Sequence, residues 1–505
     1  MVILLFRYFE ISEIFIPHSL SKNSKDLSNF AFDIETKTNR GMIMKIKFGT
    51  DGWRGVISDD FTFENLITVS LATAKYFSNH PKIENGIVVG YDARFLSDEY
   101  GKLVARVLAS KGIKVLLADK MVSSPMVSLA AKNMNLAGGI MITASHNPPK
   151  YNGFKIKGDF GGSAHPEMVA EVEKELPNVE KDFKPEDFDK LIEKGLIILT
   201  DLRDYYKKYI ISKFDINKIK NSGLKIIYDS MYGSGQGFMN ELLGIDEIHN
   251  EHNPLFGKVN PEPLQENLKE LSETVVKGNY DIGLAVDGDA DRIGAIDEKG
   301  NFVDSHKIFS LLLKYLYEKK NLRGMVVKTF STTEMLDKMC EKYGLEITVT
   351  PVGFKHVCKL MLEKDVLIGG EESGGIGVKI HLPERDGIFL GLLLTELLID
   401  YQKPLSELVQ SLEDEFGPHK YKRIDVHTTE EKKQAILSKC KSGTIKSLNG
   451  YDVIKTSDLD GYKFFVENGW LLIRASGTEP ILRFYSEADS FEKVEKLLDA
   501  GINLQ

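Results

Sequence analysis

The sequence predicts an α/β protein of several domains, and three observations support this fold class. Short aliphatic and β-branched runs alternate with longer helical patterns from Lys45 onward, and this alternation is typical of βαβ units. The runs at residues 86–90, 225–228 and 282–286 are almost continuously apolar, as expected for strands in sheets that are covered on both faces. A chain of 505 residues is also too long for one hydrophobic core, so we expect three or four domains.

The domains are predicted to follow one another along the chain. Charged helical stretches at residues 201–220 and 304–320 separate the apolar runs, and we place boundaries there. Residues 44–201, 202–303 and 304–418 are therefore predicted to form three α/β domains, which could be divergent copies of one unit. Residues 419–505 differ, because a hairpin through Asn468-Gly469 and an amphipathic helix at 491–500 indicate an α+β domain.

The first 43 residues have a different character from the rest. Residues 1–17 are apolar and aromatic, but Arg7, Glu10 and Glu13 interrupt them, so no run is long enough to span a bilayer. We expect residues 1–43 to be an atypical N-terminal extension. It could result from a mis-assigned translation start, or it could be a dispensable tail. A chain that begins at Met42 is then expected to fold and to stay active.

Charge and cysteine content narrow the possible partners and the compartment. A net charge of -9 argues against a nucleic-acid binder, since such proteins concentrate Lys and Arg on one face. An anionic substrate would instead need a local basic pocket. The three cysteines Cys340, Cys358 and Cys440 have no metal-ligand spacing, so we expect reduced, buried packing residues in a cytoplasmic protein that binds neither nucleic acid nor membrane. Oligomeric state is not predicted by any of these patterns.

One loop presents a candidate nucleophile. The segment from Thr143 to Pro148 follows the apolar run 138–142 and holds Ser145 on a tight loop directly after a buried strand. Ser145 is therefore a candidate covalent carrier. A serine in this context is also a common helix N-cap, and the segment alone leaves both interpretations open.

A second loop carries three aspartates in alternate positions. Asp287, Asp289 and Asp291 directly follow the run 284–286, so their carboxylates can converge on one point, and hard oxygen ligands favour Mg²⁺ or Ca²⁺. An EF-hand is one alternative, since Glu298 is the twelfth residue of such a loop, but Arg292 stands where glycine is required. The other alternative is a solvated acidic turn.

Two further loops are rich in polar groups. Arg474, Ser476 and Thr478, with Gly477 allowing close backbone approach, suit a phosphate dianion, although Ser-Gly-Thr also forms ordinary turns. Glu371 and Ser373 are flanked by glycines and could read sugar hydroxyls, or could belong to a flexible glycine loop.

Other residues give weaker signals. Lys155 could shuttle a proton or neutralise charge, and Arg54 is a similar case, although both could simply be solvated. The glycines at 233–237 lack the GxGxxG spacing of a dinucleotide site. A serine hydrolase is disfavoured, because no Gly-x-Ser-x-Gly surrounds Ser145 and its side chain is expected to diverge from that of His146.

Taken together, the four loops resemble, in order and spacing, those of the α-D-phosphohexomutase family, and the resemblance covers Lys45 to the C-terminus. It implies a four-domain phosphohexomutase architecture, three α/β domains and a C-terminal α+β domain around a central cleft. The first domain would carry the phosphoserine loop, the second the metal loop, the third the sugar-reading loop and the fourth the phosphate-binding loop.

The resemblance also implies roles for individual residues. Ser145 would be the phosphoserine and would join Asp287, Asp289 and Asp291 around Mg²⁺. The catalytic group would further include Lys155, Arg54 and His146. The substrate-binding residues would be Glu371, Ser373, Gly353, Lys355, Arg292, Arg474, Ser476, Gly477 and Thr478.

The implied activity is reversible phosphoryl transfer between the 1- and 6-hydroxyls of a phosphorylated hexose, with glucose 1,6-bisphosphate as activator and intermediate. Phe354 and Gly375 stand where dual phosphomannomutases tend to have histidine, and Thr143 stands where phosphoglucosamine mutases usually have serine. We therefore expect glucose 1-phosphate as substrate. Mannose and glucosamine phosphates, and a catalytically silent sugar-phosphate binding protein, are the alternatives.

Overall fold

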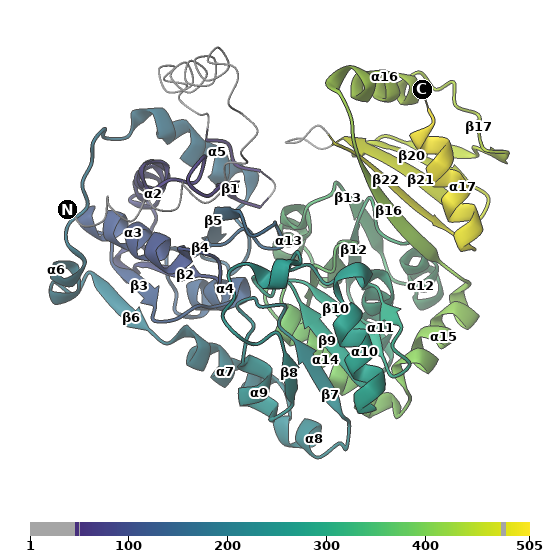
Figure 1. Ribbon diagram of the computed structural model, residues 1–505, viewed down its shortest axis with the longest axis horizontal. Coiled ribbons are helices and arrows are strands. Elements are labelled where there is room, and N and C mark those ends of the chain that lie inside the picture. The colour runs from purple at the N-terminus through teal and green to yellow at the C-terminus, as the bar shows by residue number, and fades with distance from the viewer. Residues whose placement is uncertain (1–45, 50, 476–480, 505) are drawn as a thin grey trace, which may run out of the picture. The chain divides into compact units, whose positions relative to one another are not determined.

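A computed structural model describes residues 46–49, 51–475 and 481–504 of the chain (Figure 1). The predicted N-terminal extension 1–43 lies outside the described residues, and so do Ser476, Gly477 and Thr478. Within the described part, three mixed sheets and one antiparallel sheet follow one another along the chain, which confirms the predicted fold class.

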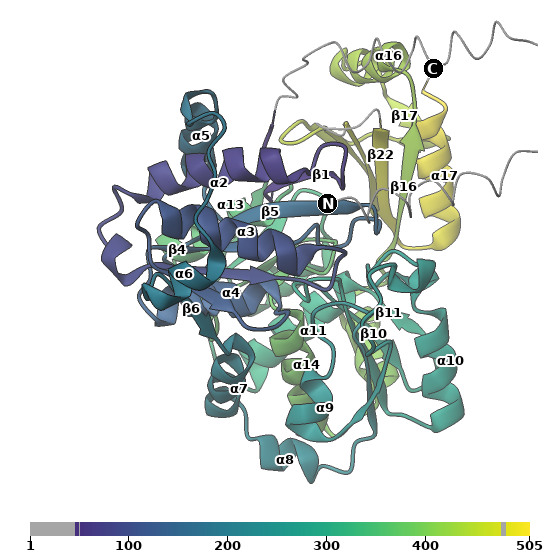
Figure 2. The ribbon, with the colours of Figure 1, turned by 60° about the vertical axis from the view of Figure 1, so that its left-hand side comes forward.

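The first sheet has the strand order β1–β5–β4–β2–β3–β6. Its strands are β1 (Trp53–Val56), β2 (Ile87–Tyr91), β3 (Val115–Ala118), β4 (Gly138–Ile142), β5 (Tyr151–Gly158) and β6 (Ile197–Thr200). Side chains alternate between two cores: Ile87 and Val89 face the core with α2 (Phe63–Phe77) and α3 (Ser97–Ser110), while Val88 faces the core with α4 (Ser124–Asn133). Both faces are therefore buried, as the apolar runs predicted; Figure 2 shows these helices around the sheet.

The second and third sheets repeat the strand order of the first. The second sheet contains β7 (Ile226–Asp229), β8 (Asp246–Ile248), β9 (Ile282–Val286), β10 (Ile293–Asp297) and β11 (Phe302–Val303). The third contains β12 (Met325–Thr329), β13 (Ile347–Thr350), β14 (Val366–Gly370) and β15 (Ile376–Val378). The orders β3–β2–β4–β5, β8–β7–β9–β10 and β13–β12–β14–β15 match, and in each the first three strands are parallel and the last is antiparallel.

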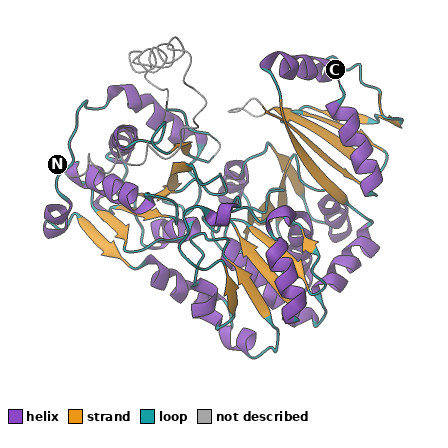
Figure 3. Cartoon of the chain, in the orientation of Figure 1, coloured by secondary structure: helices purple, strands orange, loops and turns teal. Residues whose placement is uncertain are grey.

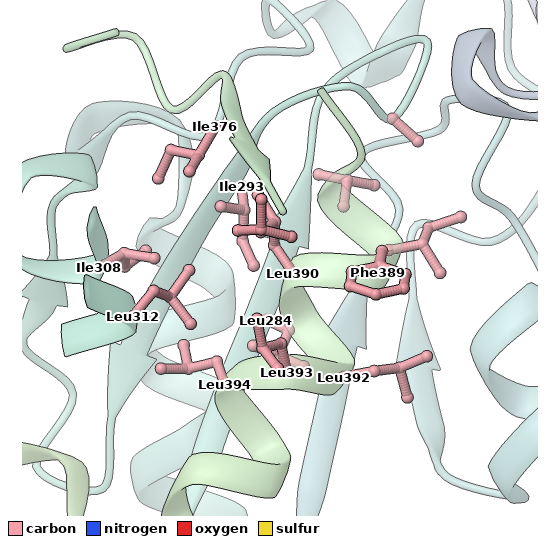
Figure 4. Close-up of a cluster of buried hydrophobic side chains, with 14 of the residues drawn as sticks. Leu284, Ile293, Ile308, Leu312, Ile376, Phe389, Leu390, Leu392, Leu393 and Leu394 are labelled. Carbon is pink, nitrogen blue, oxygen red and sulfur yellow. The ribbon is translucent and has the colours of Figure 1, made fainter. Parts of the chain in front are cut away.

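The second and third sheets share one hydrophobic core. Helix α14 (Gly387–Tyr401) places leucines against Leu284 and Ile293 of the second sheet, and α11 (Ser305–Glu318) packs beside it (Figure 4). At Gly391 a Cβ atom would lie 3.3 Å from Leu284, so the helix approaches the sheet closely. These two units are therefore not independent in their packing, which the sequence pattern did not predict.

The last sheet is antiparallel throughout. Its order is β16 (Lys420–His427), β22 (Ile481–Ala488), β21 (Gly469–Ala475), β20 (Tyr462–Val466) and β19 (Lys455–Ser457), with β17 (Ser447–Leu448) and β18 (Tyr451–Asp452) as a separate ribbon. Helices α16 (Glu430–Lys441) and α17 (Phe491–Ile502) cover one face (Figure 3). The predicted hairpin is present, but its turn is Glu467–Asn468, with Asn468 at φ 49°, and Gly469 opens the next strand.

Further helices connect these elements: α5 (Pro166–Glu175), α6 (Phe188–Glu193), α7 (Leu202–Lys213), α8 (Ile216–Lys220), α9 (Phe238–Leu243), α10 (Lys269–Gly278), α12 (Met335–Tyr343), α13 (Phe354–Glu363) and α15 (Leu405–Phe416). The side chains of Asp201 and Asp304 cap α7 and α11.

Among the described residues, no helix is both long enough and apolar enough to cross a membrane. The three cysteines are free and buried, as expected.

Candidate active site

Three of the four predicted loops occupy the same position in their sheets. The loops holding Ser145, Asp287 and Glu371 each leave the carboxyl end of the third strand (β4, β9 and β14) and return as the antiparallel fourth strand. Ligands of open α/β sheets bind at the carboxyl ends of strands. The fold therefore delivers a hydroxyl, a set of carboxylates and a polar glycine loop from equivalent places.

Ser145 is held in an uncommon backbone conformation. Its φ is 53°, in the left-handed region, and its backbone N–H donates to Thr143 Oγ1 at 2.9 Å. The loop leads into β5, so Ser145 caps no helix and the N-cap interpretation is wrong. Its Oγ donates to Asp287 Oδ2 at 2.8 Å and lies 3.3 Å from His146 Nδ1. The expected divergence of the Ser145 and His146 side chains is also wrong, because the left-handed turn brings them to one side.

The three aspartates converge as the sequence predicted. Asp287 Oδ1 accepts the backbone N–H groups of Asp291 and Arg292 at 2.9 and 3.1 Å, which curls the loop back on itself. One carboxylate oxygen of each aspartate lies within 4.8 Å of the others, and all three side chains are fully buried, which excludes a solvated turn. A strand precedes the loop, and Glu298 accepts a hydrogen bond from Ser406 N at 3.2 Å, so the loop is no EF-hand.

A cation fits this cluster. The second oxygens of Asp289 and Asp291 are each engaged by basic side chains, but their Oδ1 atoms are buried without a hydrogen-bond partner. Burial and the carboxylates of Asp291 and Asp289 also raise the pKa of Asp287 well above its usual range. Hard oxygen donors that crowd negative charge in this way match the ligand preference of Mg²⁺.

Lys155 lies at the centre of the acidic cluster. Its Nζ is 2.8 Å from Asp289 Oδ2, 2.8 Å from Asp51 Oδ2 and 3.4 Å from Asp291 Oδ2. Burial alone would lower the pKa of Lys155, but these carboxylates raise it above its usual range. Lys155 is therefore a buried cation, and the interpretation as a solvated lysine is wrong.

Sequence reasoning missed Arg385 as a member of the site. Its Nη2 lies 2.7 Å from Asp51 Oδ2 and 2.7 Å from Asp291 Oδ2, and its Nη1 is 4.0 Å from Glu371 Oε2. It precedes α14 and so reaches the cluster from far along the chain. The only local signal was a charged triplet, Glu384-Arg385-Asp386, between two buried elements.

Two more arginines and His146 complete the region around Ser145. Arg54 Nη1 donates to Asn147 Oδ1 in the serine loop, and Arg292 Nη1 pairs with Glu262 at 2.6 Å while its Nε is 3.9 Å from Asp287. Burial, followed by the positive charges of Arg292 and Arg54, lowers the pKa of His146 well below its usual range. His146 is therefore a neutral imidazole beside the Ser145 hydroxyl.

The glycine loop is a tight turn against the second sheet. Gly374 has φ 91°, and a Cβ there would lie 2.7 Å from the Ile293 carbonyl oxygen, so only glycine fits. Burial raises the pKa of Glu371 to about 7, with Arg385 opposing the shift. Ser373 is half-buried, and both glycines at 374 and 375 are buried, so the loop packs closely against its neighbours.

The remaining substrate-binding candidates lie at the edge of this network. Gly353 precedes α13 with φ 128°, and Lys355 lines a cavity of about 150 Å³ together with Asp51. Arg474 Nε donates to Asp460 Oδ2 at 3.0 Å, and the same oxygen accepts the Val352 N–H at 2.9 Å. This aspartate therefore links the Arg474 strand to the Gly353 turn, whereas no contact of Arg474 with Ser145 is observed among the described residues.

A cavity of about 550 Å³ beside α10 contains none of the predicted site residues. The candidate site is instead marked by convergence of buried charged groups from three loops, the usual sign of a functional site.

Comparison with known proteins agrees with this geometry. Family models for phosphoglucomutase/phosphomannomutase match four consecutive parts of the chain: domain I at residues 45–182, domain II at 204–300, domain III at 304–416 and the C-terminal domain at 426–503. The chain belongs to the phosphoglucomutase/phosphomannomutase family, whose enzymes are isomerases that transfer a phosphoryl group within a hexose phosphate.

Individual relatives match over nearly the whole chain. A phosphoglucomutase/phosphomannomutase of Thermococcus kodakarensis is 33% identical over 464 residues, which are 90% of this chain and 98% of the relative. A phosphoglucosamine mutase of Caldicellulosiruptor bescii is 31% identical over 462 residues, 90% of this chain and 98% of the relative. A solved structure from Thermus thermophilus, of a protein assigned as a phosphomannomutase, is 35% identical, covers 91% of this chain and 99% of its own, and has a TM-score of 0.80.

Proposed function

We propose that this enzyme interconverts the 1- and 6-phosphates of a hexose through a phosphoserine at Ser145, with glucose 1-phosphate as the preferred substrate. The observation that carries the proposal is the Ser145 hydroxyl, 2.8 Å from Asp287 in a buried carboxylate triad and beside a neutral His146. A hydroxyl so placed lies beside a candidate metal site, where a bound cation could assist phosphoryl transfer, and it has a nearby proton acceptor.

Asp287, Asp289 and Asp291 would hold Mg²⁺, with the Ser145 oxygen completing the set. When bound, the ion supplies positive charge that offsets the phosphoserine and the substrate phosphate. The chain adds its own positive charges through Lys155, Arg385 and Arg292. The raised pKa of Lys155 favours the charge-neutralising role over that of a proton shuttle.

Each half of the reaction exchanges one phosphorus–oxygen bond for another. A sugar hydroxyl gives up its proton as its oxygen attacks the phosphorus of phosphoserine, the bond from phosphorus to Ser145 Oγ breaks, and Ser145 Oγ takes up a proton, so that a hexose bisphosphate such as glucose 1,6-bisphosphate results. In the second half Ser145 Oγ attacks the other phosphate and releases its proton to His146, the bond from that phosphorus to the sugar oxygen breaks, and the leaving sugar oxygen takes up a proton to become a hydroxyl. Glu371 and Ser373 would orient the sugar hydroxyls, and Arg474 with Ser476, Gly477 and Thr478 would bind the distal phosphate.

The preference for glucose is supported by packing around Arg385. Gly375 and Phe354, where dual phosphomannomutases tend to have histidine, both contact this side chain: a Cβ at Gly375 would lie 2.4 Å from Arg385 Cδ, and the guanidinium is 5.3 Å from the Phe354 ring. At position 375, Arg385 therefore occupies space that a histidine side chain would need. The phosphoglucosamine mutases among the relatives make glucosamine phosphate the second candidate substrate.

Phosphorus NMR tests the proposal directly. The enzyme is incubated with Mg²⁺, catalytic glucose 1,6-bisphosphate and one of glucose, mannose or glucosamine 1-phosphate, and appearance of the 6-phosphate is followed. Fastest conversion of glucose 1-phosphate supports the proposal, and fastest conversion of another sugar reassigns the substrate. Release of inorganic phosphate alone would indicate a hydrolase, and binding without turnover a silent binding protein. Ser145→Ala is the control that must abolish conversion.

A further inference from the structure

Arg94 forms an unusual set of contacts behind the serine loop. It lies between β2 and α3, is buried, and directs all four Nη–H groups at backbone carbonyl oxygens. Nη2 donates to the carbonyls of Ser145 and Asn147, both at 2.6 Å, and Nη1 donates to those of Pro148 and Tyr151, both at 3.0 Å. One side chain thus holds four points of the segment from Ser145 to Tyr151.

On its other side the guanidinium forms an ion pair with Asp92, without a hydrogen bond from Nε. Its Nε lies 3.3 Å from Asp92 Oδ2, and Asp92 Oδ1 accepts the Arg94 backbone N–H at 3.0 Å and the Ser97 hydroxyl at 2.7 Å. The ring of Phe256, from the second α/β unit, lies 4.9 Å from the guanidinium carbon. Arg94 therefore has few other positions available, which makes it a rigid anchor for the loop.

The same kind of support recurs in the two related sheets. In each sheet the first strand lies beside the third, so the loop after the first strand can reach the loop after the third. Ser234 N, after β7, donates to the Gly288 carbonyl at 2.9 Å, and Ser331 Oγ, after β12, donates to Glu372 Oε2 at 2.6 Å. Arg94 occupies the corresponding loop after β2. The recurrence indicates a supporting role that comes with the fold, and the arginine is its most extensive form.

We propose that Arg94 is a positioning residue for Ser145, and this inference rests on the proposed phosphoserine function. By holding the Ser145 carbonyl, Arg94 keeps Ser145 in its left-handed conformation, and that conformation directs Oγ toward Asp287. The phosphoserine loop must keep this geometry while it gains and loses a doubly charged group in every turnover. Loss of the four-point contact lets Oγ leave the line of attack without removing any group that touches the sugar.

The test compares Arg94→Lys and Arg94→Gln with Arg106→Lys. Lysine at position 94 keeps a cation near Asp92, but a single ammonium cannot reach all four carbonyls. Arg106 is the matched control: it also donates to loop carbonyls, those of Glu186 at 2.9 Å and Pro185 at 3.2 Å, but away from the site. Mutase kinetics are expressed per folded chain, with the folded fraction measured by circular dichroism. Phosphorylation of Ser145 by glucose 1,6-bisphosphate is timed separately by mass spectrometry.

For Arg94→Lys we expect kcat to fall by about 100-fold, as for a small misplacement of a reacting group, while KM changes by less than about threefold. Phosphorylation of Ser145 should slow by a similar factor, and Arg106→Lys should match the wild type in both. A kcat per folded chain within about twofold of the wild type, or losses that only follow the folded fraction, would overturn the inference. If Arg94→Gln does not fold, Arg94→Lys decides alone. A wild-type enzyme without mutase activity would count against the proposed function, whereas an active wild type with unaffected Arg94 variants counts against Arg94 only.

Discussion

The buried ion pair between Lys157 and Glu384 gives a sharp test of how the site is held together. Lys157 lies on β5 of the first sheet, Glu384 precedes α14, and their charged atoms are 2.6 Å apart with neither side chain exposed. Glu384 also accepts from Ser128 Oγ at 3.1 Å and from the Arg385 backbone N–H at 3.1 Å. The pair therefore joins two distant chain segments directly beside Arg385.

The change Glu384→Gln leaves the Lys157 ammonium buried without its counter-charge. Removing one partner of such a pair costs about 3–5 kcal/mol, because the remaining charge cannot regain water. An exposed pair is a suitable control: Lys102 and Glu99 are 2.7 Å apart, but their side chains are 42% and 50% exposed. Glu99→Gln should cost at most about 1 kcal/mol.

Thermal unfolding followed by circular dichroism measures the difference. For a cooperative unit of roughly 150–250 residues, each kcal/mol lowers the melting midpoint by about 2–4 °C. A loss of about 3–5 kcal/mol then corresponds to a fall of about 6–20 °C in the first melting midpoint. Adding Lys157→Met to Glu384→Gln should recover much of the loss, because the uncompensated charge is then gone. Since Lys157 and Arg385 hold the pKa of Glu384 below its usual range despite burial, the stabilisation should be present at neutral pH and decline on acidification below the ordinary carboxyl range. A midpoint for Glu384→Gln no lower than that of Glu99→Gln would refute the reasoning.

Three further outcomes are expected. Ser145→Ala should fold normally but lose mutase activity by more than about 1000-fold and take up no phosphoryl group, as mass spectrometry will show. Chelation of divalent cations should abolish activity, Mg²⁺ should restore it, and Asp289→Asn should raise the Mg²⁺ concentration needed for half-maximal rate by about 10-fold or more. Because burial raises the pKa of Glu371 to about 7, its contribution to stability is present below the ordinary carboxyl pKa and is lost as pH rises through about 7. Glu371→Gln should therefore have a higher melting midpoint than the wild type at alkaline pH. If the ionised Glu371 carboxylate accepts sugar hydroxyls, the KM of the wild type should fall as pH rises through 7. A KM that does not change with pH would count against that role.

Much of the site was predictable because each loop has a recognisable local sequence pattern. The serine, the alternating aspartates and the glycine-flanked glutamate all follow apolar runs, and a strand followed by a polar loop needs only short-range sequence information. Helices begin after Asp201 and Asp304 as predicted, since these capping aspartates are adjacent in sequence to the helices they begin, but the stretch predicted as helical at 201–220 is divided into α7 and α8.

The supporting residues were not predictable in this way. Arg385 carries no motif, and its role depends on Asp51, which lies more than 300 positions earlier and contacts it only after folding. Arg94 could be assigned a role only once β2 was known to lie beside β4. The conformation of Ser145 was hidden for a related reason, because a left-handed serine is maintained by tertiary contacts that override its local preference.

The repeated strand order explains why the active site draws on three separate loops. In all three sheets the third strand is flanked by the first strand and by an antiparallel return, so its carboxyl end is always held on both sides. A loop in that position can carry reactive groups while neighbouring strands support it, and the three loops hold different groups: a hydroxyl, carboxylates and the glutamate that we propose orients the sugar. The residues that hold each loop in place are set by the shared strand order, whereas the reactive groups are set by the sequence of the loop itself. Substituting the supports should therefore alter kcat through geometry, whereas substituting the loop residues should remove a chemical step.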